Sequence, residues 1–421
     1  MRLRLPPTVV FGAGSLGELP RVLAELGVAR PLIVTDAGVA AVGLPARVVR
    51  QLAVMGITAH CWDGVVSDPD EGQAELCCSQ AAMAGCDGIV ALGGGSVIDA
   101  AKVGAVLATN GGRTRDYFGF DRVPRRGLPV VAVPTTPGSG SEVSSHAVLV
   151  RREPRRTKEV VAGVHLLASA ALIDPELAAT LPRRETVCSA LDSLFHAIEA
   201  FVARRATPLS DAFARLAVPQ IATALPRVIG ATGPEADGPD ADGPEVSGRD
   251  AAAARESLAL GCLYANLAMA NANAGVIHAL GYPLTGRFGI PHGLANALVG
   301  VAALESTWRG RPERYAELAR LLGGGGAPAE TAAPVETAAA AGREVAEAAS
   351  LGQLVGRLLA AVGVQDRLAD WAVGQADLPR LAVEASRFRP VLENTPASLD
   401  EGALLAIYRA ALAAPAAAPI L

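Results

Sequence analysis

Four side chains between residues 192 and 292 have the types and spacing of a metal site. Asp192 and His196 are four residues apart, which places both on one face of a helix. His278 and His292 follow, so three of the six histidines fall in these two segments. A carboxylate with three imidazoles suits a divalent transition metal and leaves a coordination position for substrate. The alternative for each histidine alone is a hydrogen-bonded core residue.

A run of three glycines has the chemistry of an anion site. Gly93, Gly94 and Gly95 follow an apolar strand and lead through Ser96 and Asp99 into a predicted helix. Glycines let a diphosphate approach the backbone, and the first N–H groups and the dipole of the helix attract it. The run is neither GxGxxG nor a Walker A motif, because no GK[ST] follows. It predicts a diphosphate site, with a structural glycine turn as the alternative.

A second loop of small hydroxyl side chains follows the strand at 129–133. Its members are Thr135, Thr136, Ser139 and Ser141. Ligands of open α/β sheets bind beyond the carboxyl ends of the strands, so we expect this loop and the glycine run to border one nucleotide site. Ordinary turn chemistry is the alternative.

Asp36, at the end of an earlier strand, bears on the choice of dinucleotide. Its carboxylate can accept hydrogen bonds from the adenosine ribose and would repel a 2′-phosphate, which predicts NAD rather than NADP. A helix cap is the alternative. The segment 11–17, FGAGSLG, looks superficially like a dinucleotide fingerprint. We expect no such role, because no acidic residue ends a second strand at the required distance from it.

Two domains should position these residues, because 421 residues are too many for one ordinary domain. Residues 1–184 alternate short β-branched runs with Ala-rich helical spacing, which predicts an NAD-binding α/β domain with a parallel sheet. Long Ala/Leu stretches in 185–421 predict a helical metal-binding domain. Two segments rich in Gly, Pro, Ala and acidic residues, near 230–248 and 323–341, predict exposed insertions.

Composition and charge exclude several partners. The net charge of −5 leaves no basic field for a nucleic acid. No segment approaches the roughly 20 unbroken apolar residues that span a bilayer, and the start lacks an apolar leader, so we expect a cytoplasmic protein with no membrane partner. The cysteines lack paired CxxC spacing, which predicts reduced thiols. Only Lys102 and Lys158 are lysines, so each is a candidate for a role that a guanidinium cannot fill.

Together these segments resemble the iron-containing (group III) alcohol dehydrogenase family, whose pattern includes GGGSxxDxAK, PTTxGTGSE, a helical DxxxH and a later histidine pair ending in PHG. The resemblance covers nearly the whole chain outside the two insertions. It implies the dehydroquinate synthase-like fold, NAD(H) with a divalent metal, Fe²⁺ or Zn²⁺, as cofactors, and a homodimer as a common family state. By resemblance, Asp192, His196, His278 and His292 bind the metal, and Gly94, Gly95, Ser96, Asp99, Thr135, Thr136 and Lys158 contact the cofactor.

The sequence departs from the family pattern at Tyr282, where many members carry another histidine close to the nicotinamide. A tyrosine donates a hydrogen bond, but its ordinary pKa near 10 makes it a poor proton shuttle at neutral pH. The stretch 281–293 looks most like the phosphonoacetaldehyde reductase branch. That likeness implies NADH-linked reduction of phosphonoacetaldehyde to 2-hydroxyethylphosphonate.

Arg287, five residues beyond Tyr282, is the candidate phosphonate anchor, because a guanidinium binds such a group bidentately. A solvated loop arginine is the alternative. The rival functions are a general alcohol or diol dehydrogenase of the same family and a lyase resembling dehydroquinate synthase. For each of these functions except the lyase, the small-molecule substrate is an aldehyde or an alcohol.

Overall fold

The computed structural model describes residues 3–152, 157–231, 248–324 and 338–414. The chain divides into two compact units, Arg2–Leu181 and Pro182–Leu421. Most of each predicted insertion, 232–247 and 325–337, lies outside the described residues.

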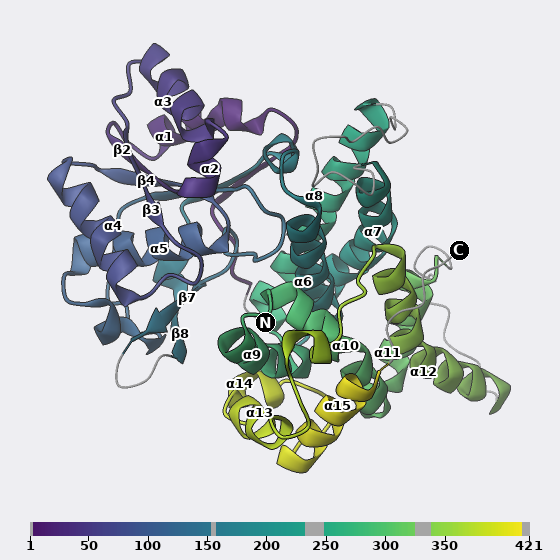
Figure 1. The fold of residues 1–421 in the computed structure, drawn as a ribbon. Helices are drawn as coiled ribbons and strands as arrows, with labels where there is room; N and C mark the ends of the chain where they lie inside the picture. Colours follow the sequence, from purple (N-terminus) through teal and green to yellow (C-terminus); the bar gives the residue numbers. More distant parts are fainter. Residues whose placement is uncertain (1–2, 153–156, 232–247, 325–337, 415–421) are drawn as a thin grey trace. The chain divides into compact units, whose positions relative to one another are not determined.

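A six-stranded sheet forms the core of the first unit (Figure 1). All of its strand pairs are parallel. The central strand β4 is buried along its whole length, as expected for a strand covered on both faces. In spatial order the strands are β1 (Thr8–Phe11), β9 (Ala170–Ile173), β6 (Val130–Pro134), β4 (Gly88–Gly93), β2 (Pro31–Asp36) and β3 (His60–Val65).

Helices cover both faces of this sheet because successive strand side chains point to opposite sides. In β2, Leu32 and Val34 pack in one cluster with residues of α4 and α5, while Ile33 packs in another with residues of α1 and α3. The predicted α/β fold with a parallel sheet is thereby confirmed. The helices are α1 (Leu19–Glu25), α2 (Ala37–Ala41), α3 (Leu44–Val54), α4 (Glu71–Met83) and α5 (Gly95–Asn110).

A small second sheet packs beside α5. It contains β5 (Gly119–Phe120), β8 (Thr157–Ala162) and β7 (His146–Arg151), and β7 pairs antiparallel with β8. Lys102 of α5, fully buried, holds the loop that leads into β7. Its ammonium donates to the carbonyl oxygens of Ser141 at 2.9 Å, Ser144 at 3.1 Å and His146. Three acceptors around one nitrogen suit the compact lysine head and not a planar guanidinium.

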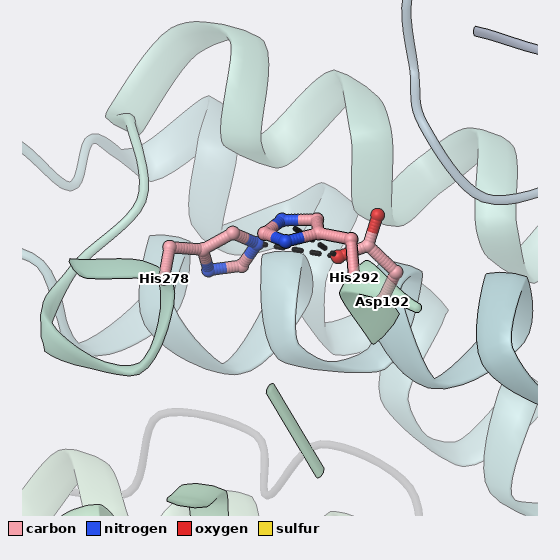
Figure 2. Close-up of side chains that lie close together, drawn as sticks. All are labelled: Asp192, His278 and His292. Carbon is pink, nitrogen blue, oxygen red and sulfur yellow. Dashed lines mark ion pairs between the residues drawn. The ribbon is translucent and has the colours of Figure 1, made fainter. Parts of the chain in front are cut away.

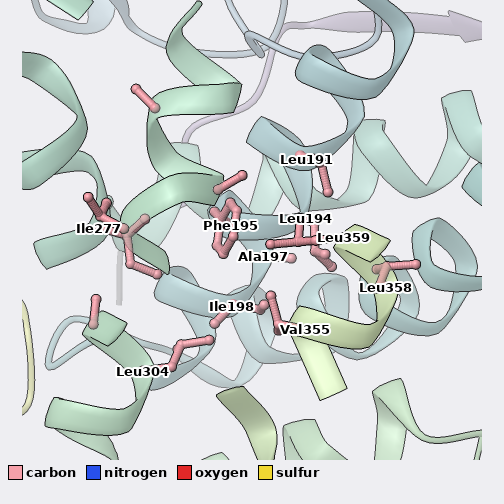
Figure 3. Packing of buried hydrophobic residues seen from close by; sticks show 14 of the residues in the cluster. Leu191, Leu194, Phe195, Ala197, Ile198, Ile277, Leu304, Val355, Leu358 and Leu359 are labelled. Carbon is pink, nitrogen blue, oxygen red and sulfur yellow. The ribbon is translucent and has the colours of Figure 1, made fainter. Parts of the chain in front are cut away.

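In the described residues of the second unit, all regular secondary structure is helical. Its helices are α6 (Arg183–Val202), α7 (Pro208–Ala231), α8 (Gly248–Ala272), α9 (Val276–Phe288), α10 (His292–Thr307), α11 (Pro312–Leu322), α12 (Ala338–Ala361), α13 (Leu378–Ala385), α14 (Arg389–Leu392) and α15 (Glu401–Ala413). Helix α6 is buried on all sides from Ala190 to Val202. Figure 3 shows Phe195 and Ile198 of α6 packed among residues of α9, α10 and α12. Among the described helices, each is too short or too polar to cross a membrane.

Candidate metal centre and cofactor site

The candidate metal centre is built on a polar stripe of the central helix α6. Asp192, His196 and Glu199 follow one another at four- and three-residue spacing, so they share one face of an otherwise apolar helix. All three are at least 92% buried. Because burial of polar groups is costly, such a stripe needs partners from neighbouring helices.

Those partners come from α9 and α10 (Figure 2). The Asp192 Oδ1 atom lies 3.4 Å from His278 Nε2, 3.7 Å from His292 Nε2 and 3.9 Å from His196 Nε2. One ligand atom each from Asp192, His278 and His292 lies within 4.8 Å of the other two. His196 is not in that set of three, although its ring stacks on the His278 ring with centroids 4.7 Å apart.

Hydrogen bonds behind the cluster orient its side chains. His196 Nδ1 lies 3.0 Å from Asn266 Oδ1, and His278 Nδ1 lies 2.5 Å from Glu199 Oε2. Asn296 donates to Asp192 Oδ1 at 2.9 Å. Since the two imidazoles use Nδ1 for these outer contacts, both present Nε2 toward Asp192.

The start of α10 lies very close to α6. A Cβ atom on Gly293 would sit 1.8 Å from the Cys188 carbonyl oxygen and 3.2 Å from Asp192 Cβ. Only glycine therefore allows this approach, which brings His292, the first residue of α10, to the cluster. The His292 side chain is 28% exposed, so the cluster opens on this side.

Electrostatics favour an ionised aspartate in this cluster. Burial alone would raise the pKa of Asp192, but the surrounding imidazoles, led by His196, outweigh it and lower the pKa. Burial lowers the pKa of His196. Burial also acts to lower the pKa of His278, but Glu199 and Asp192 outweigh it and raise that pKa to about 9.

The donor set fits a divalent transition metal. His278 Nε2 is buried and has no hydrogen-bond partner among the described residues, while its Nδ1 is occupied. Metal-ligating histidines typically use one ring nitrogen for a hydrogen bond to a carboxylate and the other for the ion. In His278, Nδ1 contacts Glu199, and Nε2 lies near Asp192 without a hydrogen bond. Asp192, His278 and His292 would hold the ion, and His196 Nε2 is close enough to Asp192 to join them.

In the α/β unit, the predicted cofactor residues gather at the carboxyl edge of the sheet. The neighbouring strands β2, β4 and β6 end at Asp36, Gly93 and Pro134. Thr135 donates its backbone N–H to the Gly93 carbonyl at 3.1 Å. The end of each strand thus contributes one of the segments that the sequence predicts for the dinucleotide.

The glycine run and the hydroxyl loop touch each other at this edge. A Cβ atom on Gly95 would lie 2.5 Å from Ser139 Oγ and 3.3 Å from Ser141 Oγ, and one on Gly94 would lie 3.3 Å from Thr136 Oγ1. Helix α5 starts at Gly95, with Ser96 next, and its first N–H groups have no acceptor within the helix. These groups fit the diphosphate of a dinucleotide.

In the fingerprint-like segment 11–17, two backbone N–H groups that could bind a phosphate already have an acceptor. The Asp174 carboxylate accepts hydrogen bonds from the backbone N–H groups of Gly14 and Leu16, each at 3.1 Å. These donors are therefore satisfied within the protein.

Comparison with known proteins assigns each of the two units to a family model. Residues 6–175 match the family model for iron-containing alcohol dehydrogenase, and residues 186–237 and 245–412 match the model for the C-terminal part of the Fe-containing alcohol dehydrogenase family. The chain belongs to the iron-containing alcohol dehydrogenase family.

Among individual relatives of this family, the NAD-dependent methanol dehydrogenase of Bacillus methanolicus is 33% identical over 81% of this chain and 83% of its own. The sulfoacetaldehyde reductase of Bilophila wadsworthia is 29% identical over 96% of each chain. A crystal structure of 1,3-propanediol oxidoreductase superposes with a TM-score of 0.86 at 28% identity, covering 97% of this chain and 99% of that one.

Membership of the iron-containing alcohol dehydrogenase family confirms the predicted enzyme class, an oxidoreductase of the alcohol dehydrogenase type. Iron stands in the family's description and NAD in the name of the methanol dehydrogenase, so the predicted cofactor pair is that of the family.

Tyr282 and Arg287, the residues predicted to act on the substrate, both contact other side chains of the helical unit. The Tyr282 ring stacks on the His292 ring, with centroids 5.2 Å apart and planes 1° from parallel, and also packs on Phe388. Burial raises the pKa of the Tyr282 phenol, so it stays protonated at neutral pH. Arg287 Nε donates to both carboxylate oxygens of Glu384, at 3.0 and 2.9 Å. The predicted anchor therefore already has an anionic partner.

Three predicted cofactor residues also make contacts within the α/β unit. The Asp36 side chain accepts from Val39 N and caps α2. Asp99 Oδ2 accepts from Val148 N at 2.8 Å. Lys158 Nζ lies 2.7 Å from Asp68 Oδ1. Contacts of these three side chains with a dinucleotide remain predictions.

Glu199, Asn266 and Asn296 are the residues that sequence reasoning did not single out. Glu199 carries a signal that could have been used, since it continues the stripe of Asp192 and His196 on an apolar helix. The two asparagines lie in Ala/Leu-rich helices, and nothing in their spacing distinguishes them.

Proposed function

We propose that this protein catalyses the NADH-linked, metal-dependent reduction of an aldehyde to a primary alcohol, with phosphonoacetaldehyde as the substrate and 2-hydroxyethylphosphonate as the product. The observation that carries the proposal is the cluster of Asp192, His278 and His292, which opens on the His292 side, in a member of the iron-containing alcohol dehydrogenase family.

In this proposal Asp192, His196, His278 and His292 are the metal ligands. The cofactor contacts are Asp36, Gly93, Gly94, Gly95, Ser96, Asp99, Thr135, Thr136, Ser139, Ser141 and Lys158. When bound, the divalent ion supplies Lewis acidity toward the carbonyl oxygen and NADH supplies the hydride. The protein keeps Asp192 ionised and orients the His196 and His278 rings so that Nε2 of each points toward Asp192.

Tyr282 acts on the exposed side of the cluster. Its ring holds the His292 ring by parallel stacking, and Phe388 supports it from another side. Because its pKa is raised, the phenol can donate a hydrogen bond to a developing alkoxide oxygen but does not cycle through a phenolate. The proton that the product requires then comes from solvent.

The anionic group of the substrate is the finer part of the proposal. A sulfonate and a phosphonate both present oxygens that a guanidinium binds bidentately, and the Bilophila relative is named for a sulfonated aldehyde. Arg287 lies on the same helix as His278 and Tyr282. A phosphonate would have to replace Glu384 at its guanidinium.

The test compares kcat/KM for phosphonoacetaldehyde, sulfoacetaldehyde and propanal, using protein reconstituted anaerobically with Fe²⁺. A preference of about 100-fold for the phosphonate over propanal corresponds to about 2.7 kcal/mol of differential transition-state binding. We expect Arg287→Ala to raise KM for phosphonoacetaldehyde and sulfoacetaldehyde but not for propanal. Arg380→Ala is the matched control, because this exposed arginine also contacts Glu384. Equal kcat/KM values for the three aldehydes would refute the phosphonate assignment.

A general alcohol or diol dehydrogenase is the second candidate, and the ion pair of Arg287 with Glu384 favours it. If that pair persists during turnover, the substrate needs no anionic group. Glu384→Gln separates the two candidates, because releasing Arg287 should lower KM for phosphonoacetaldehyde at least several-fold under the first proposal. Under the second, KM for every aldehyde stays the same.

A further inference from the structure

Glu199 joins three donors of the segment that carries His278. Its Oε2 accepts from Gly275 N at 2.9 Å and lies 2.5 Å from His278 Nδ1, while its Oε1 accepts from Ile277 N at 2.6 Å. The side chain is only 4% exposed. Among the described residues, no lysine or arginine forms an ion pair with it. Within the described ranges, the hydrogen-bond donors to this carboxylate are therefore two backbone N–H groups at the start of α9 and His278.

These contacts determine which nitrogen of His278 carries the proton. Backbone N–H groups only donate, and an ionised carboxylate only accepts, so His278 Nδ1 must be the donor in its contact with Glu199. In the neutral ring Nε2 then carries the lone pair. That atom is the one that lies 3.4 Å from Asp192 Oδ1.

We propose that Glu199 is a positioning residue that sets the metal affinity of the centre through His278. A carboxylate hydrogen-bonded to the outer nitrogen of a ligating imidazole orients the ring and increases its basicity. Glu199 also adds a second negative charge beside Asp192, so the two carboxylates together balance a divalent ion. This inference rests on the proposed function, in that it takes the cluster to be a metal site.

Glu199→Gln in the full chain tests the proposal. Glutamine keeps the shape and one acceptor oxygen but loses the charge, and its NH₂ group faces backbone donors. We expect the apo variant to bind Zn²⁺ about 10- to 100-fold more weakly than the apo wild type, measured by competition with a chromophoric chelator. Glu199→Asp, which restores the charge, should recover part of the affinity.

Asp211→Asn is the matched control. Asp211 is also a buried carboxylate of the helical unit, but it pairs with Arg314 and does not touch the cluster. A general loss of stability from removing a buried charge would appear in this variant too. We expect its Zn²⁺ affinity to equal that of the wild type.

A second measurement does not require the variant to fold. In the Zn²⁺-loaded wild type, the His278 Nδ1 proton should give a far-downfield ¹H resonance coupled to Nδ1, as expected for a strong hydrogen bond to Glu199. Protonation of Nε2 in its place would overturn the proposal, and so would equal Zn²⁺ affinities of Glu199→Gln and wild type. A wild type that binds no Zn²⁺, Co²⁺ or Fe²⁺ would instead overturn the metal site itself.

Discussion

Gly293→Ala should weaken metal binding although it leaves every candidate ligand in the sequence. The added Cβ would lie 1.8 Å from the Cys188 carbonyl oxygen, whereas a carbon and an oxygen in contact need about 3.3 Å. Helix α10 must therefore retreat from α6 by about 1.5 Å. His292, the preceding residue, moves with it, although metal–ligand distances tolerate only about 0.2 Å.

Removing a hydrogen-bond partner of a metal ligand typically lowers metal affinity by about 10- to 100-fold. We expect Gly293→Ala, which displaces a ligand itself, to lower Zn²⁺ affinity by at least as much. The overpacked contact should also cost about 1–3 kcal/mol of unfolding free energy. Chelator competition measures the first quantity and urea denaturation of the apo protein measures the second.

Gly286→Ala is the control, because it makes the same change on the histidine-bearing helix α9 at a place where no atom lies within 4 Å of the new Cβ. It should bind Zn²⁺ like the wild type and gain about 0.5–1 kcal/mol of stability. A Gly293→Ala protein with wild-type Zn²⁺ affinity would refute the link between the close helix approach and the position of His292.

Four further predictions concern stability and the site. Lys102→Met should cost about 3–5 kcal/mol in urea denaturation, because it leaves three buried carbonyl groups and Asp99 without their cation, whereas Lys158→Met at a half-exposed ion pair should cost less than about 1 kcal/mol. Burial lowers the pKa of His146 to about 4, so the unfolded chain takes up its proton first as the pH falls below about 6.5. Unfolding free energy should then fall by up to about 3 kcal/mol between pH 6.5 and 4, and His146→Gln should flatten that dependence. Tyr282→Phe should retain Zn²⁺ affinity and Tyr282→Ala should lose it, if ring stacking on His292 is what the side chain contributes. Free Zn²⁺ at 100 times its Kd should raise the unfolding free energy by about 2.7 kcal/mol, and His278→Ala should abolish this effect.

The parts of the site that could be predicted from the sequence are those that local periodicity encodes. Asp192 and His196 share a helix face because of their spacing alone, whatever surrounds the helix. Asp36 and Gly93 end buried strands and Thr135 follows one, and neighbouring parallel strands bring their carboxyl ends to one edge of the sheet. Neither prediction required knowledge of a distant contact.

The parts that could not be predicted depend on contacts between segments far apart in the chain. Glu199 is separated from His278 by 79 residues, and Asn296 from Asp192 by 104. The partner of Arg287 lies 97 residues away, so the sequence shows a free arginine on a metal-site helix where the structure shows an ion pair. Lys102 is a similar case, since the sequence marks it only as a candidate for a role that a guanidinium cannot fill. The packing of the loop before β7 then directs its ammonium to carbonyl groups.

The charges of the helical core explain why this cluster favours a bound cation. Asp192 and Glu199 are two carboxylates buried on one helix, and among the described residues their ion pairs are with imidazoles alone. Lysine or arginine in place of the histidines would neutralise the two carboxylates permanently, so no metal ion would be needed. Histidines can instead lose a proton when a metal ion binds and then act as its ligands. A core arranged in this way is completed by a divalent cation, and its demand for that cation is independent of which aldehyde the enzyme reduces.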